Sequence, residues 1–91
     1  MLTSKQDEIL LILQEECAEV IQAVSKIKRF GLMDNLDQLK MELADLQCMI
    51  DLVQDNNICQ YEGDEFNNRI RLKREKLKRY SSIFKTDLSV N

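Results

Sequence analysis

Two stretches of sequence decide the fold: residues 9–30 read ILLILQEECAEVIQAVSKIKRF, and residues 32–53 read LMDNLDQLKMELADLQCMIDLV. In both stretches apolar side chains recur every three or four residues, which is the spacing of one face of a helix. Gly31 separates them, and glycine favours the left-handed position that follows a helix end. The pattern therefore predicts two helices joined by a short loop, packed as an antiparallel hairpin.

Capping signals set the limits of three predicted helices. Thr3 followed by Gln6 has the spacing of a capping box at the start of the first helix. Either Asp34 or Asn35 can cap the second. No stretch alternates as a strand does, so the expected fold class is all-α, a helical hairpin plus a C-terminal helix. The predicted helices span residues 4–30, 35–55 and 64–83.

Length and composition restrict the class of protein further. The chain has 91 residues, which predicts a single domain over residues 1–91 with a modest core. Its three cysteines are an odd number and it has no histidine, so neither a disulfide framework nor a zinc site is expected. No apolar run is long enough to span a bilayer. We therefore expect a cytoplasmic protein that gains stability by oligomerisation, as a four-helix bundle across a dimer.

Acidic residues recur at i, i+3 spacing on both hairpin helices. Glu16 and Glu19 lie about 60° apart around the first helix, and Glu42 and Asp45 repeat this spacing on the second. Apolar neighbours place the four acids at or near the seam of the hairpin, where an unpaired charge is costly. A hard divalent cation such as Mg²⁺, which prefers oxygen ligands, would offset that cost. The alternative from the residues alone is a solvated acidic helix face.

The two acidic motifs also resemble a known family. EECAE at residues 15–19 followed by ELAD at residues 42–45 is similar to the EExxE…ExxD signature of the MazG-like nucleotide pyrophosphohydrolases, of the all-α NTP pyrophosphatase superfamily. The resemblance covers about residues 8–54 and extends to small single-domain members, including phage-encoded ones. It implies metal ligation by Glu16, Glu19, Glu42 and Asp45, with Glu15 supporting this set or binding a second metal ion.

The same resemblance implies an activity. The expected reaction is hydrolysis of a (deoxy)nucleoside triphosphate between the α and β phosphates, which gives the monophosphate and pyrophosphate. The implied cofactor is Mg²⁺, which Mn²⁺ can replace, and the implied assembly is a homodimer or a dimer of dimers.

Charge is segregated along the chain. Residues 1–68 hold 14 acidic and 5 basic residues, whereas residues 69–91 hold 8 basic and 2 acidic ones. Such asymmetry predicts either an anionic ligand held by the basic part or an electrostatic match between the two parts. Carboxylates supply no positive charge, so basic side chains are also needed to hold a triphosphate. The candidates for this role are Lys26, Arg29, Arg69, Lys73 and Lys76.

Three alternatives stay open. The chain could be a related enzyme of the superfamily, such as a dUTPase-like or phosphoribosyl-ATP pyrophosphohydrolase. It could be a non-catalytic helical dimer that binds nucleic acid through the basic helix at residues 69–79. It could also be an inactive relative that acts as an adaptor. The presence of all four implied ligands ranks the adaptor last.

Overall fold

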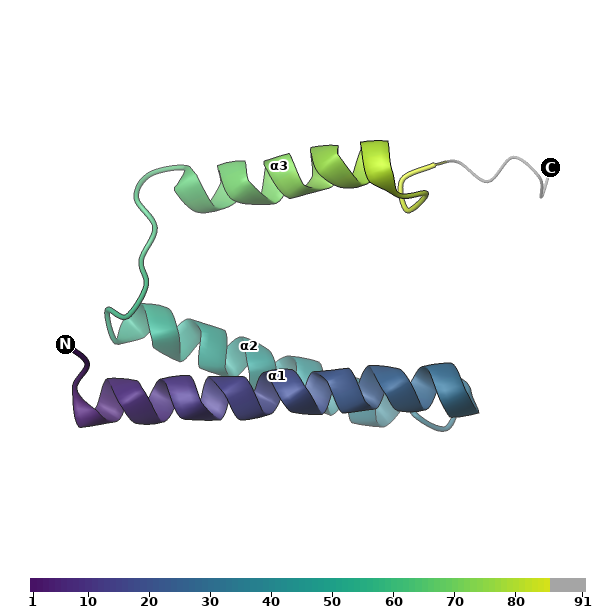
Figure 1. Ribbon diagram of the computed structural model, residues 1–91, viewed down its shortest axis with the longest axis horizontal. Coiled ribbons are helices and arrows are strands. Elements are labelled where there is room, and N and C mark those ends of the chain that lie inside the picture. The colour runs from purple at the N-terminus through teal and green to yellow at the C-terminus, as the bar shows by residue number, and fades with distance from the viewer. Residues whose placement is uncertain (86–91) are drawn as a thin grey trace. The chain divides into compact units, whose positions relative to one another are not determined.

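The computed structural model describes residues 1–85 and contains three helices, α1 (Ser4–Phe30), α2 (Leu36–Asp55) and α3 (Glu65–Tyr80), as Figure 1 shows. No strand occurs among these residues, so the predicted all-α class is confirmed. The chain divides into two compact units, Met1–Gln60 and Tyr61–Asn91. Within residues 1–85, none of the helices combines the length and the apolar character needed to cross a lipid bilayer.

Helix α1 begins and ends where its local signals predict. The backbone N–H of Gln6 donates to Thr3 Oγ1 at 3.1 Å, and the Thr3 N–H donates to Gln6 Oε1 at 3.0 Å, which completes a capping box. At the other end, the Gly31 N–H donates to the Ile27 carbonyl at 2.8 Å. Gly31 has φ 97° and ψ 159°, so it leaves the helix through an extended positive-φ conformation rather than the left-handed helical one. Glycine suits this position because residues with a Cβ rarely adopt a φ of this value.

The other two helices differ slightly from the predicted ranges. Helix α2 begins at Leu36, and the side chain of Asn35 does not cap it; instead, Asn35 Nδ2 donates to the Gly31 carbonyl at 2.8 Å. Helix α3 ends at Tyr80, three residues before the predicted limit. There, both the N–H and the hydroxyl of Ser81 donate to the Leu77 carbonyl, at 2.9 and 2.8 Å, while the Ser81 backbone is extended. This local alternative to a further helical turn is typical of serine.

Helices α1 and α2 lie side by side and run antiparallel (Figure 1). Gln6 Nε2, near the start of α1, donates to the carbonyl of Asn56, just after α2, at 2.8 Å. Each helix contributes one stripe of buried or half-buried positions with alternating spacings of three and four residues, which is the spacing of a coiled-coil seam. The stripes are Ile9, Leu13, Glu16, Val20, Ala23 and Ile27 on α1, and Leu39, Glu42, Leu46, Met49 and Val53 on α2.

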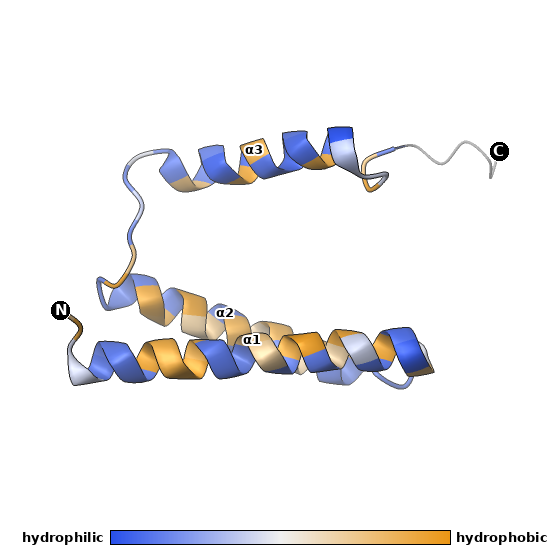
Figure 2. Cartoon of the chain, viewed as in Figure 1, coloured by the Kyte–Doolittle hydropathy of each residue, from blue (hydrophilic) through white to orange (hydrophobic). Residues whose placement is uncertain are grey.

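The flanks of this seam stay open. Val24, Leu36 and Leu43, which the periodicity places among the core positions, are 37 %, 36 % and 48 % exposed. A two-helix seam covers only one stripe of each helix, so the hairpin itself offers the neighbouring apolar positions nothing to pack against. Figure 2 shows apolar residues along much of the surface of α1 and α2. The hairpin by itself therefore has the modest core that the chain length predicts.

The unit that contains α3 is more polar. None of the residues of α3 is buried, and Figure 2 shows mainly hydrophilic residues along it. The start of α3 is held by an edge-to-face contact between the rings of Tyr61 and Phe66, whose centroids are 4.9 Å apart. Phe84 lies beyond the end of α3, and its ring centroid is 4.8 Å from the guanidinium carbon of Arg74, within the helix. Such cation–π contacts are favourable even at exposed sites.

Candidate metal centre

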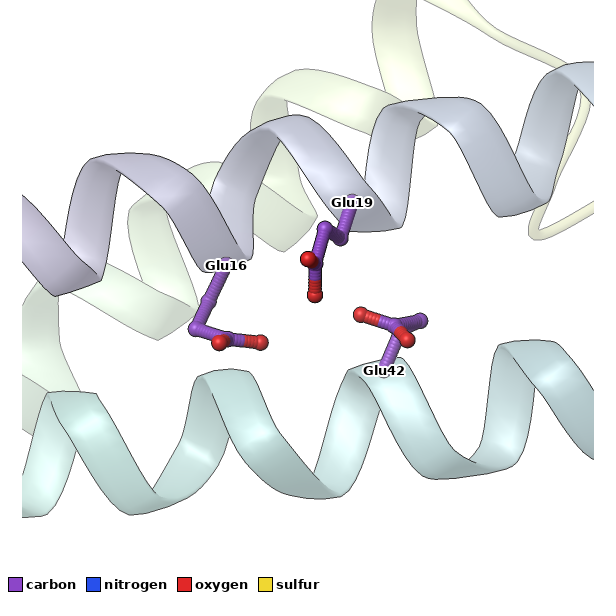
Figure 3. Close-up of side chains that lie close together, drawn as sticks. All are labelled: Glu16, Glu19 and Glu42. Carbon is purple, nitrogen blue, oxygen red and sulfur yellow. The ribbon is translucent and has the colours of Figure 1, made fainter.

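Three carboxylates from two helices converge at the seam. Glu16 and Glu19 come from α1 and Glu42 comes from α2, and Figure 3 shows their carboxyl groups pointing into the space between the helices. One carboxylate oxygen from each residue lies within 4.8 Å of the other two. Glu42 is buried, with 3 % of its surface exposed, whereas Glu16 is half-buried and Glu19 is exposed. The cluster therefore extends from the seam to the solvent, so a small ligand can reach it.

Two oxygens of this cluster lack a partner. Glu42 Oε1 accepts a hydrogen bond from Gln38 Nε2 at 2.8 Å, but Glu42 Oε2 is buried with no hydrogen bond. Glu16 Oε2 is in the same situation. Nearly all buried polar atoms in proteins are hydrogen-bonded, so two unpaired oxygens in one cluster are available to a proton, a water molecule or a cation.

The crowding of negative charge changes the acidity of the cluster. A hydrogen bond that protonated Glu42 can donate to the Glu19 carboxyl, followed by burial and by the charges of Glu19, Glu16 and Asp45, raises the pKa of Glu42 from 4.5 to about 7. Burial, followed by the charges of Glu19 and Asp45, also raises the pKa of Glu16. Both effects disfavour the charged form. Without a cation, the carboxylates of this cluster are therefore partly protonated as a group near neutral pH.

The donor set fits a hard divalent ion. All three groups offer carboxylate oxygens, which suit Mg²⁺, Mn²⁺ and Ca²⁺ rather than softer metals. Opposite ligands lie about 4 Å apart across Mg²⁺ and about 5 Å apart across Ca²⁺. The three oxygens lie within 4.8 Å of one another, so the side chains would have to move closer together for one ion to contact all three.

The remaining predicted acids lie at the edge of this cluster. Asp45 is exposed, one turn beyond Glu42 on α2, and is not among the mutually close carboxylates. Its charge nevertheless raises the pKa of both Glu42 and Glu16, so it lies close enough to act on them. Glu15 is also exposed and contributes to the raised pKa of Glu16 alone. The structure thus brings three of the four predicted ligands together and places Asp45 beside them.

The two candidate bases of α1 lie away from the carboxylates. Lys26 and Arg29 are exposed in the last two turns of α1, and Lys26 is seven residues beyond Glu19, which corresponds to about 10 Å along the helix axis. The guanidinium carbon of Arg29 lies 5.4 Å from the ring centroid of Phe30. The structure therefore does not bring these two bases to the carboxylate cluster.

The three candidate bases of α3 share one surface. Arg69, Lys73 and Lys76 line a hollow of about 250 Å³ together with Leu72 and Arg79. Arg79 was not among the favoured candidates, although it lies three residues after Lys76 on the same helical face. The hollow gathers four positive charges on one side of α3, which is an arrangement suited to an anion with several oxygens.

Gln38 is a further residue that the sequence reasoning missed. The only signal is its position four residues before Glu42, where an amide and a carboxylate on one helix face can hydrogen-bond. Such pairs are common on exposed helices, and Gln47 makes an equivalent bond to Asp51 Oδ1 at 3.0 Å. The spacing alone therefore does not distinguish Gln38 from a surface residue.

The all-α hairpin and the carboxylates that converge at its seam define the class of this protein as a small helical protein with a candidate oxygen-only cation site. A family model described as the MazG nucleotide pyrophosphohydrolase domain matches residues 4–79, and the chain belongs to this family. The match includes α1 and α2 and nearly all of α3, so it confirms the resemblance seen in the acidic motifs and extends it beyond them. No curated protein and no solved structure matched the chain significantly.

Proposed function

We propose that this protein is a Mg²⁺-dependent nucleoside triphosphate pyrophosphohydrolase, which cleaves between the α and β phosphates and releases the monophosphate and pyrophosphate. The observation that carries the proposal is the pair of buried, unpartnered oxygens of Glu16 and Glu42, two residues whose carboxyl groups converge with that of Glu19. Membership of a nucleotide pyrophosphohydrolase family supports the same conclusion from an independent direction.

In this proposal Glu16, Glu19 and Glu42 hold the metal ion, and Asp45 completes the set from its position at the edge. The bound ion would neutralise phosphate charge and orient the phosphate oxygens. Glu42 has to release its proton when the ion binds, because its pKa is about 7 and only the carboxylate is a good ligand. Glu19 is exposed, which leaves the cluster accessible to the substrate. Glu15 adds negative charge beside Glu16 without contributing an oxygen to the cluster.

The basic hollow of α3 is our candidate for binding the β and γ phosphates. Arg69, Lys73, Lys76 and Arg79 can each donate charge-assisted hydrogen bonds to phosphate oxygens. We favour this hollow over Lys26 and Arg29 because it gathers four charges on one surface.

We further propose that two hairpins from two chains form a four-helix bundle. Only Ile9, Ala23 and Met49 form the buried apolar core of the described chain, which is small even for a short domain. Apolar residues remain exposed on the flanks of the hairpin, including Ile21 on α1 and Met41 on α2, at 66 % and 51 %. A separate hollow of about 450 Å³ lies along α2, and side chains of a second hairpin could pack into it. The hollow is lined by Ala44, Gln47, Cys48, Asp51, Leu52 and Asp55.

A substrate panel tests the activity directly. Purified protein with Mg²⁺ is incubated with canonical and modified nucleoside triphosphates, and the monophosphate, pyrophosphate and orthophosphate are quantified separately. We expect equal amounts of monophosphate and pyrophosphate from at least one substrate, and turnover should be lost in Glu16→Gln and kept in Glu8→Gln, an exposed acid at the start of α1. Release of orthophosphate alone would contradict the proposed bond cleavage. A Mg²⁺-independent, salt-sensitive mobility shift with DNA or RNA, without turnover, would favour nucleic-acid binding instead.

A further inference from the structure

Gln38 forms a hydrogen bond with Glu42, which is the only ionisable residue that is buried within residues 1–85. Its Nε2 donates to Glu42 Oε1 at 2.8 Å from one turn earlier on α2. Within residues 1–85, no other N–H group donates a hydrogen bond to the carboxyls of Glu16, Glu19 or Glu42. Gln38 is therefore the one amide that restrains the cluster.

This hydrogen bond distinguishes the two oxygens of Glu42. Oε1 is engaged by the amide, whereas Oε2 is buried and unpartnered. One oxygen of Glu42 lies within 4.8 Å of a carboxylate oxygen of Glu16 and of Glu19. The hydrogen bond competes with a cation for Oε1, so it favours ligation through Oε2 alone. The difference matters because Ca²⁺ readily accepts both oxygens of a carboxylate, whereas Mg²⁺ requires near-octahedral geometry with single oxygens.

We propose that Gln38 is a positioning residue that restricts Glu42 to single-oxygen ligation and thereby favours a small six-coordinate ion over Ca²⁺. The inference rests on the proposed metal site and concerns which ion that site selects. Residues that orient metal ligands from outside typically change metal affinity by about 10–100-fold when they are replaced. The restraint is local to the helix, since Gln38 and Glu42 are both in α2 and are four residues apart.

The chain provides a matched control on the same helix. Gln47 Nε2 donates to Asp51 Oδ1 at 3.0 Å, with the same i, i+4 geometry, but this pair is exposed and lies outside the carboxylate cluster. Methionine is close to glutamine in size and favours helices, but it cannot donate a hydrogen bond. Gln38→Met and Gln47→Met therefore remove the same kind of bond, one at the cluster and one away from it.

The test is a titration of the metal-free protein with Mn²⁺ and with Ca²⁺ by calorimetry, without nucleotide. We expect Gln38→Met to weaken Mn²⁺ binding by about tenfold and Ca²⁺ binding by clearly less, so that the Mn²⁺ preference falls. Gln47→Met should bind both ions as the wild type does, and sedimentation of both variants checks that assembly is unchanged, because Gln47 also lines the hollow on α2. Unchanged Mn²⁺ affinity in Gln38→Met, or an equal loss for both ions, would overturn the inference. Gln38→Ala, which preserves helix propensity, provides a second measurement if the methionine variant loses its helical circular dichroism.

These outcomes are separable from the proposed activity. A wild-type protein that binds Mn²⁺ but releases no pyrophosphate from any nucleotide would contradict the proposed function and leave the selectivity test intact. A wild-type protein that binds neither ion would overturn both.

Discussion

Glu16 on α1 and Glu42 on α2 occupy positions of the hairpin seam that apolar residues hold along the rest of its length, and each has a buried oxygen without a hydrogen-bond partner. An apolar residue at either position would pack better, and a carboxylate is tolerated there only with a proton or a cation. The same two side chains that suit the site to metal binding therefore weaken the metal-free hairpin. Folding and metal binding therefore place opposite demands on these two residues. The resulting effects on stability and activity would not be expected for a solvent-exposed acidic helix face.

Glu42→Gln should separate stability from function. Glutamine keeps the size of glutamate but removes its negative charge, which is repelled by the charges of Glu16, Glu19 and Asp45. In EDTA at pH 8, we expect the variant to melt at a higher temperature than the wild type, while Mn²⁺ binding and turnover are lost. Thermal melts and calorimetry measure the two effects. Glu8→Gln is the control, and a lower melting temperature for Glu42→Gln at this pH would contradict the proposed strain at the seam.

The stability of the metal-free protein should fall as the pH rises. The folded state raises the pKa of Glu42 from 4.5 to about 7, so folding favours the protonated form. This contribution is fully present below pH 4.5 and is lost as the pH rises through about 7. We expect melting temperatures in EDTA to decrease between about pH 5 and pH 8. Excess Mg²⁺ should reduce or reverse the decrease, because the ion binds the deprotonated carboxylates. In Glu42→Gln the slope in EDTA should be smaller, and an equal slope in both proteins would assign the pH dependence to other groups.

Glu19→Gln should abolish turnover with little effect on stability. Glu19 is exposed, so its amide analogue keeps its solvent contacts, but one oxygen ligand of the cluster is lost. We expect kcat/KM to fall by at least about 100-fold at moderate Mg²⁺, with an unchanged helical signal. Asp45→Asn should show a similar loss if Asp45 completes the metal site, whereas Glu15→Gln should show a smaller one. Steady-state kinetics over a range of Mg²⁺ concentrations distinguishes the three, and full activity in Glu19→Gln would contradict the metal-site assignment.

The basic hollow of α3 should act on substrate binding rather than on metal binding. Lys73→Gln removes one of its four charges, and a charge-assisted hydrogen bond contributes about 1.5–3 kcal/mol. We expect KM for the nucleotide to rise by about tenfold or more, while Mn²⁺ affinity without nucleotide stays the same. Lys78→Gln is the matched control, because Lys78 lies outside the hollow and pairs with Glu75 at 3.6 Å. Equal KM values for the two variants would contradict the proposal that this hollow binds the phosphates of the substrate.

Local signals predicted more of this molecule than long-range ones. The bounds of α1 follow from a capping box and a glycine, both of which act within a few residues. The i, i+3 spacing of the acids predicted that they share a helix face, but not that Glu42 lies in the seam and Asp45 at its edge. That distinction depends on the register of α1 against α2, which the loop after Phe30 and the packing of apolar residues fix together. The early end of α3 was missed because it depends on Ser81, whose side chain can either continue or stop a helix.

Ile21→Arg should dissociate the proposed dimer. Ile21 is 66 % exposed on the flank of the hairpin, where a charged side chain would be well tolerated in a monomer but would be buried without a partner in a four-helix bundle. We expect the wild type to sediment as a dimer or tetramer and Ile21→Arg to sediment as a smaller species with a lower melting temperature. Gln22→Arg, the next and also exposed position of α1, is the control and should keep the wild-type assembly. If the wild type were monomeric at micromolar concentration, or if both variants kept the same mass, the hairpin would have to be stable without a second chain. The covering of its open flanks would then need a different explanation.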